Sequence, residues 1–311
     1  MHNIVVPIGS AKCFDKERSH MGQKDLTQKN LEYYPDVFAD IMNALLYEGK
    51  QVVQPAELES APTETIYHSK EGNLRNQFHD LSKYEMREGI IRLQYTIENE
   101  MYPNNKLVFR KAGYAGAVYR EQYDRKNKKM YPFISLVLYW GKRKNRIQKS
   151  IRSLFSAELP EETMRYIDDA KLYIYDMRNL PKDVRQLFRS DMRIIVDYLA
   201  EGGEYQPTNQ VIVHIEEFLL LMQALTGDNR YEQILPQLEK REKQGGITMC
   251  ELLDKYENRG IQKGMKKGIK ALVETCQELG LSQIDTITRV IQKFAVSQEE
   301  GTKWAQKYWI A

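Results

Sequence analysis

The sequence predicts an α/β region followed by an all-helical region, and three observations support this fold class. Residues 90–98 alternate between apolar and polar side chains, as in a strand with one buried face. The run PFISLVLYWG at 132–141 is apolar on both faces, which is typical of a buried central strand. From about residue 183 onward, successive segments carry a helical apolar period.

Composition indicates a globular protein of about two domains. The chain has 311 residues, of which 42% are apolar and 29% are charged. No apolar run approaches the roughly 18 residues that would span a bilayer, so we expect no membrane partner. Three scattered cysteines without a CxxC pair argue against a disulfide framework and a zinc site, and they favour a reducing, cytoplasmic location. The chain has neither a P-loop nor a GxGxxG motif, so we expect no nucleotide cofactor.

The amino-terminal part is expected to begin with a disordered leader, because residues 1–24 join no pattern. Apolar side chains then recur at steps of three and four over residues 25–49, which predicts a helix. Pro35 predicts a break or a restart within it, and Gly49 is a suitable C-cap. Residues 51–72, which include two prolines, are expected to form a loop.

A β-hairpin that carries two carboxylates is the central prediction. Strands are expected near 76–85 and 90–99, with Gly89 in the turn because Gly readily adopts positive φ. This turn places Asp80 opposite Glu98 to within about one residue, and opposed Cβ atoms lie about 4.5–5.5 Å apart. Such carboxylates repel unless a cation lies between them, and Mg2+ takes oxygen ligands of this kind. The alternative is that both are solvated surface residues, since a one-residue slip would separate them.

The remaining elements follow from the same periodicities. Residues 106–124 are predicted to form a helix or a turn that leads to one, and residues 172–177 a further strand. Helices are expected at 183–200, 208–225, 228–243, 247–258, 261–280, 283–294 and 297–308. Glycines at 260, 264 and 268 with cations between them predict a flexible basic connector. The residues after it are expected to pack on their own core or on a second subunit.

A basic stretch follows the predicted helix at 106–124. Residues 125–152 contain ten Lys or Arg residues and no acidic residue, although the net charge of the chain is only +3. Such a stretch is usually a solvated face, but it can also follow a nucleic-acid backbone. The candidate contacts are Arg125, Lys126, Lys128, Lys129, Lys142, Arg143, Lys144, Arg146 and Lys149. Together with a carboxylate pair and a metal, a basic groove suggests phosphodiester hydrolysis.

Six segments stand in an order and spacing that is specific only when they are taken together. They are FADIMNALLYEGKQVVQPAEL at 38–58, R-x4-D at 75–80, YTIENE at 95–100, R-x3-Y-x4-Y-x2-Q at 110–122, PFISLVLYWG at 132–141 and MCELLDKYENRGIQKGMKKGI at 249–269. In these segments the chain resembles the Rpn-type recombination-promoting nucleases and transposases of bacteria, a branch of the PD-(D/E)XK nuclease superfamily. The resemblance spans most of residues 25–270.

The resemblance implies a restriction-endonuclease-like core, a mixed sheet flanked by helices, that cleaves double-stranded DNA with Mg2+ or Mn2+. It assigns a nuclease-like core to residues 25–180, a helical subdomain to 181–258 and a helical tail to 259–311, with a homodimer as a further expectation. Asp80 and Glu98 match the metal carboxylates of the family. Supporting positions match Asp40, Arg75 and Gln122.

The chain departs from the family pattern at position 100, where a Gln or Lys that orients water is expected. Glu100 stands there instead, and it is the third residue of the expected catalytic set. A carboxylate cannot stabilise a hydroxide as a lysine would, although it can bind a second metal or act as a base. The alternative expectation is therefore a catalytically weakened protein that keeps the nuclease fold as a DNA-binding or assembly module.

Overall fold

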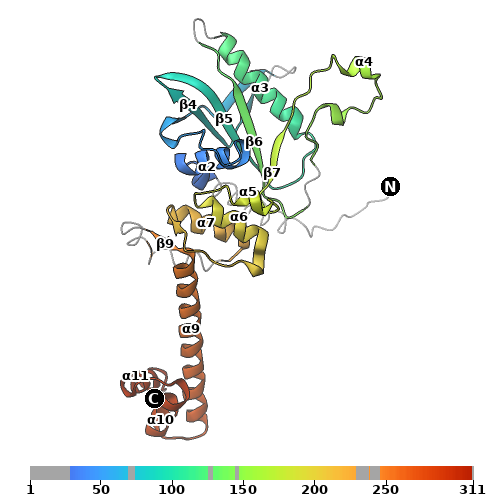
Figure 1. Ribbon diagram of the computed structural model, residues 1–311. Helices are drawn as coiled ribbons and strands as arrows, with labels where there is room; N and C mark the ends of the chain where they lie inside the picture. Colours follow the sequence, from blue (N-terminus) through green and yellow to red (C-terminus); the bar gives the residue numbers. More distant parts are fainter. Residues whose placement is uncertain are drawn as a thin grey trace, which may run out of the picture. The chain divides into compact units, whose positions relative to one another are not determined.

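The computed structural model describes residues 29–68, 74–124, 129–143, 147–228, 238 and 246–309 (Figure 1). The chain forms two compact units, Met1–Ile247 and Thr248–Ala311. None of the described helices combines the length and the apolar character that a membrane crossing requires. The predicted leader at 1–24 and most of the helix predicted at 228–243 lie outside the described residues.

The first unit is built on a five-stranded mixed sheet with the order β1-β4-β5-β6-β7. These strands are β1 (Leu58–Ser60), β4 (Leu81–Arg87), β5 (Ile90–Glu100), β6 (Phe133–Tyr139) and β7 (Tyr173–Asp176). The first three pair in antiparallel fashion, whereas β6 pairs with β5, and β7 with β6, in parallel. A parallel pair needs a crossover, which helix α3 (Leu107–Asp124) provides between β5 and β6. The mixed sheet with its helices confirms the predicted fold class.

The hairpin of β4 and β5 forms around the predicted turn. Glu88 and Gly89 have φ values of 54° and 72°, and positive φ at both central residues is what a type I′ turn requires. After an irregularity between Glu85 and Met86, the register pairs Leu81 with Ile97. One step further along this register, Asp80, which directly precedes β4, lies opposite Glu98 of β5.

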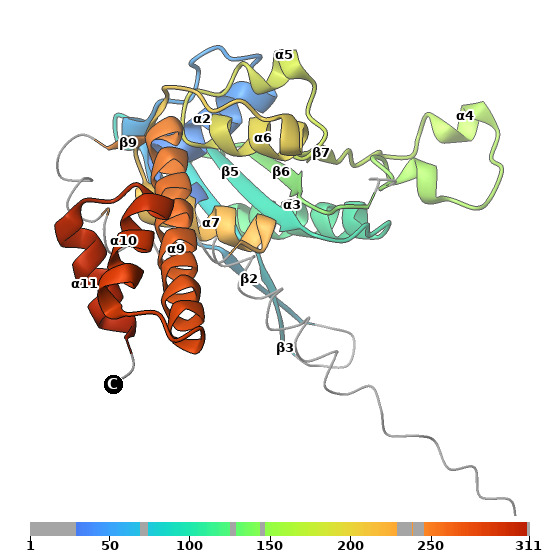
Figure 2. The ribbon, with the colours of Figure 1, turned by 90° about the horizontal axis from the view of Figure 1, so that it is seen from below.

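The two faces of the sheet are covered by different helices. Helix α2 (Pro35–Leu46) begins at Pro35, the predicted restart, because proline fits the first turn of a helix. The Tyr95 hydroxyl of β5 lies 2.7 Å from the Tyr47 hydroxyl just after α2. Alternate residues of β5 point to the other face, where Glu98 contacts α3. Figure 2 shows α2 and α3 on opposite sides of the sheet.

Three predictions for the first unit are wrong. The helix expected at 208–225 begins only at Ile215, and the residues before it include a short strand, Val211–Ile212. The loop expected at 51–72 contains β1 and also β2 (Glu64–His68), which pairs with β3 (Leu74–Phe78) as a separate two-stranded sheet. The single helix expected at 183–200 is two helices, α5 (Lys182–Arg185) and α6 (Met192–Glu201). The other elements of this unit are η1 (Pro55–Glu57), η2 (Arg152–Leu154), α4 (Glu161–Met164), η3 (Gly202–Glu204), β8 (Val211–Ile212) and α7 (Ile215–Thr226). The short β9 (Ile247–Thr248) follows.

The second unit consists of three helices, α9 (Met249–Glu278), α10 (Gln283–Phe294) and α11 (Gln298–Tyr308). Its apolar side chains pack on one another around Ile269, Val273, Val290 and Ala305. The flexible connector expected at Gly260–Gly268 is wrong, because α9 runs through all three glycines without a break. The domain boundary expected between 258 and 259 lies within α9, and the expected division into domains stays a prediction. A capping box of Thr248 and Glu251 stabilises the start of this helix.

Candidate functional site

Three carboxylates lie at one end of the β4–β5 hairpin. Glu98 and Glu100 are two residues apart on β5, so their side chains leave the same face of the sheet. Asp80 directly precedes β4, and its Oδ2 accepts a hydrogen bond of 2.7 Å from the backbone nitrogen of Asn99. Burial raises the pKa of Glu100 against the influence of Arg110, and repulsion from Glu98 and Asp80 raises it further. The three carboxylates of the predicted catalytic set are therefore close enough to influence one another electrostatically.

Glu98 is the best-shielded member of this set, with a side chain that is only 3% exposed. Its Oε1 lies 3.2 Å from Lys111 Nζ and 3.1 Å from His79 Nδ1. Its Oε2 accepts a hydrogen bond of 2.8 Å from Arg110 Nη2. Burial acts to raise the pKa of Glu98, but Lys111, His79 and Arg110 together lower it to about 2. The carboxylate is thus ionised at neutral pH, which is the form that binds a cation.

Helix α3 supplies a buried cation that the sequence analysis missed. Lys111 is 5% exposed and contacts both Glu98 and the Ser135 hydroxyl of β6. Burial lowers the pKa of Lys111, whereas the charge of Glu98 acts in the opposite direction. The sequence did offer one signal for Lys111. It lies next to Arg110 in the family-like motif R-x3-Y-x4-Y-x2-Q at 110–122, on the same helix. The Tyr114 ring packs against His79 with centroids 4.3 Å apart, and burial and Glu98 raise the pKa of Tyr114 to about 12.

The other two carboxylates are also paired with cations. Lys29 Nζ lies 2.9 Å from Asp80 Oδ1, and both side chains are partly exposed. Arg110 Nη2, which bonds Glu98, also contacts Oε1 of Glu100. The Arg110 side chain is 39% exposed, so it reaches the carboxylates from the protein surface.

The donor chemistry of these residues fits a hard divalent cation. Asp80, Glu98 and Glu100 offer only oxygen ligands, which suit Mg2+ or Mn2+ better than a soft metal. Across the described part of the chain, no group of three or more His, Cys, Asp or Glu side chains has the spacing of a metal site. The carboxylates therefore have suitable chemistry, but each is paired with a lysine or arginine nitrogen, and Glu98 with His79 as well.

The structure does not bring Asp40 to the three carboxylates. Asp40 lies in α2, where its carboxylate accepts hydrogen bonds from the backbone nitrogens of Arg189 and Ser190 and from the Ser190 hydroxyl. Burial raises the pKa of Asp40 although these hydrogen bonds oppose it. The role of Asp40 in the described structure is to hold the segment between α5 and α6.

The remaining supporting residues have different positions. The Gln122 side chain accepts a hydrogen bond of 2.8 Å from the Tyr131 backbone nitrogen and donates one of 3.1 Å to the Tyr131 carbonyl oxygen. It therefore fastens the end of α3 to the segment that enters β6 and does not contact the carboxylates. Arg75 lies in β3, and its side chain is outside the described part of the structure.

The basic stretch is divided between the two ends of β6. Lys129 precedes the strand, whereas Lys142 and Arg143 follow it, and all three are exposed. Glu100 pairs with Tyr139 in the parallel register of β5 and β6, so Lys142 and Arg143 leave the sheet at the end that carries the carboxylates. Lys149 is also exposed. Residues outside the described ranges are Arg125, Lys126, Lys128, Lys144 and Arg146.

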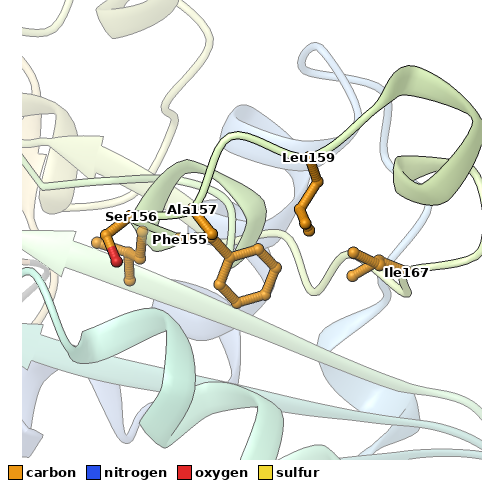
Figure 3. Close-up of a pocket in the computed structure, with 6 residues that line it drawn as sticks. Phe155, Ser156, Ala157, Leu159 and Ile167 are labelled. Atoms are coloured by element: carbon orange, nitrogen blue, oxygen red, sulfur yellow. The ribbon is translucent and has the colours of Figure 1, made fainter.

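A cavity of about 430 Å³ lies in the segment that connects β6 and β7, and none of the predicted site residues lines it (Figure 3). It is lined by Leu154, Phe155, Ser156, Ala157, Leu159 and Ile167. An apolar lining of this kind provides no group that could activate water or neutralise a phosphate. The carboxylate cluster is thus the better candidate for chemistry.

In a comparison with protein families, residues 42–223 match the model described as putative transposase, YhgA-like. This range covers more than half of the chain and includes all three carboxylates, α3 and the whole five-stranded sheet. Comparisons with curated proteins and with solved structures gave no match.

Proposed function

Because the chain belongs to the family of YhgA-like putative transposases, we propose that it is a metal-dependent DNA endonuclease that acts in recombination or transposition. The observation that carries this proposal is the convergence of Asp80, Glu98 and Glu100 at one end of the β4–β5 hairpin. Two of these acids are largely buried and their charges are offset by Arg110 and Lys111. Buried carboxylates with shifted pKa values are concentrated at functional sites, which supports a role in phosphodiester hydrolysis.

Each residue of the site has a separate role in the proposed reaction. Asp80 and Glu98 would hold Mg2+ or Mn2+, which when bound lowers the pKa of a water molecule and neutralises charge on the phosphate. Lys111 keeps Glu98 ionised from the protein side, because its ammonium group lies 3.2 Å from Oε1. Glu100 adds a third carboxylate, which can accept a proton from the attacking water.

Double-stranded DNA is the proposed substrate. Lys142 and Arg143 lie at the same end of the sheet as the carboxylates and are exposed, so they can contact phosphates next to the scissile bond. Contacts of this kind make binding depend on salt, since each neutralised phosphate releases counterions. We expect the affinity for DNA to fall steeply as the salt concentration rises.

Cleavage of supercoiled plasmid tests the proposal. We expect nicked or linear product in Mg2+ or Mn2+, and loss of at least about 100-fold in rate for Asp80→Asn and Glu98→Gln, because both remove a metal ligand. Glu88→Gln is the matched control, since Glu88 is an exposed acid in the turn of the same hairpin. Cleavage that survives both site substitutions would refute the assignment.

A second candidate function is a DNA-binding or assembly module without catalytic activity. It is favoured by Glu100, which stands where the family pattern expects Gln or Lys, and by the contact of Arg110 with both Glu98 and Glu100. Such a module would bind DNA in a salt-dependent way and cleave nothing at any Mg2+ or Mn2+ concentration. Cleavage by the wild-type chain that Glu98→Gln abolishes would exclude it.

A further inference from the structure

Arg110 is bonded to the two carboxylates that share a face of β5. A single atom, Nη2, donates a hydrogen bond of 2.8 Å to Glu98 Oε2 and also contacts Oε1 of Glu100. A divalent ion that bound either of these two oxygens would have to displace Arg110 from it. The guanidinium group and such an ion therefore compete for the same ligands.

Lys111, the neighbouring cation, is held in a different way. Its side chain is 5% exposed, and its ammonium group is fixed between Glu98 Oε1 and the Ser135 hydroxyl. The Arg110 side chain is 39% exposed. Moving the Arg110 head group into water is therefore less costly than moving Lys111, which would require a buried ammonium group to cross the packed helix. Of the two cations that bind Glu98 from α3, Arg110 is the one that an incoming ion could replace.

The charges around the site lead to the same conclusion. Among the described residues, Asp80, Glu98 and Glu100 form ion pairs with Lys29, Arg110 and Lys111. A divalent ion would add two positive charges to this partly buried set. Release of Arg110 would remove one positive charge, which favours exchange over simple addition.

We propose that Arg110 competes with the divalent ion for Glu98 and Glu100, so that Arg110 sets the metal affinity of the site and turns toward solvent when metal binds. The inference rests on the proposed function for its metal. It adds that, in the metal-free protein, the exchangeable side chain of Arg110 occupies the carboxylate oxygens of the site. The released guanidinium group lies at the surface where a DNA phosphate would approach, and arginine suits phosphate through its paired donors.

Calorimetric titration of the full chain with Mn2+, without DNA, tests this exchange. We expect Arg110→Met to bind Mn2+ about 10- to 100-fold more tightly than wild type, because two charge-assisted hydrogen bonds no longer compete. Arg120→Met is the matched control, since Arg120 is an exposed arginine on the same helix, and it should bind as wild type does. Glu98→Gln in the Arg110→Met background should remove the tight binding.

Three outcomes are decisive. Equal or weaker Mn2+ binding by a folded Arg110→Met chain, with wild-type binding that still depends on Glu98, overturns the exchange and leaves the proposed function intact. Absence of Mn2+ binding in both proteins overturns the metal site and the exchange together. If circular dichroism shows that Arg110→Met is unfolded, Arg110→Lys replaces it, because a shorter ammonium side chain keeps the charge but loses reach. Unchanged affinity in Arg110→Lys then overturns the proposal.

Discussion

Glu98 is the residue on which the candidate site depends. A carboxylate that is 3% exposed destabilises a protein unless its charge is matched and its oxygens are hydrogen-bonded. Here both oxygens are bonded, one by Lys111 and His79 and the other by Arg110. The network therefore stabilises the fold only while it is complete, and loss of one partner leaves a buried charge without compensation.

Lys111→Met tests this dependence. We expect the substitution to lower the free energy of unfolding by about 3–5 kcal/mol, the usual cost of removing one partner from a buried ion pair. Urea denaturation followed by circular dichroism measures the change. Lys106→Met, at an exposed lysine just before the same helix, should stay within about 0.5 kcal/mol of wild type. If the two variants are equally stable, the ion pair does not contribute as described.

Among the elements, those with a strong local period could be predicted from the sequence. The turn at Gly89 follows from the alternation of the strand after it, strand β6 from a run that is apolar on both faces, and α10 from a helical period whose predicted bounds equal the observed ones. The missed elements depend on partners distant in the sequence. Strand β1 has only three residues and is defined by pairing with β4, from Leu58 opposite Glu85 to Ser60 opposite Lys83.

The gap between α5 and α6 has a similar cause. Local propensity favours one helix, but Asp40 binds the backbone nitrogens of Arg189 and Ser190 and holds them out of a helix.

The candidate site could also be predicted only in part, because some of its contacts depend on residues distant in the sequence. Spacing could bring Asp80 near Glu98, whereas the approach of Lys111 depends on how α3 packs on the sheet, which no local period encodes.

Helix α9 allows a prediction at the scale of the element. A Cβ added at Gly260 or Gly264 would meet nothing within 4 Å, so Ala at either position should stabilise the helix by about 0.5–1 kcal/mol. Gly268 is the matched control, because its added Cβ would lie 3.0 Å from the Phe294 ring. Thermal unfolding should show a higher midpoint for Gly260→Ala than for Gly268→Ala. The reverse order would mean that α9 is not a continuous helix at these positions.

At the scale of the molecule, each unit has its own apolar interior. The first has its large buried side chains around the five-stranded sheet, and they include Tyr95 and Trp140. The second has Ile269, Val273, Val290 and Ala305 in its interior. The apolar residues of the tail thus pack within their own unit. Whether the chain also forms the expected homodimer stays a prediction.

Deletion of residues 249–311 tests this independence and leaves β9, the partner of β8, in place. We expect the remaining chain, residues 1–248, to unfold in one cooperative urea transition with a midpoint close to that of the same unit in the full chain, because each unit has its own apolar interior. Plasmid cleavage by the shortened chain should persist if the proposed chemistry belongs to the first unit. A non-cooperative transition would show that the first unit depends on the second.

The internal matching of acids by Lys29, Arg110 and Lys111 bears on how such a protein would exist in a cell. Many metal-binding proteins fold only when the metal ion is bound, because repulsion between the ligand side chains destabilises the metal-free fold. In this chain the acids are already paired with lysine and arginine side chains, so we expect the first unit to fold without a metal ion. Under the proposed function, the supply of divalent ions would then control cleavage and not folding.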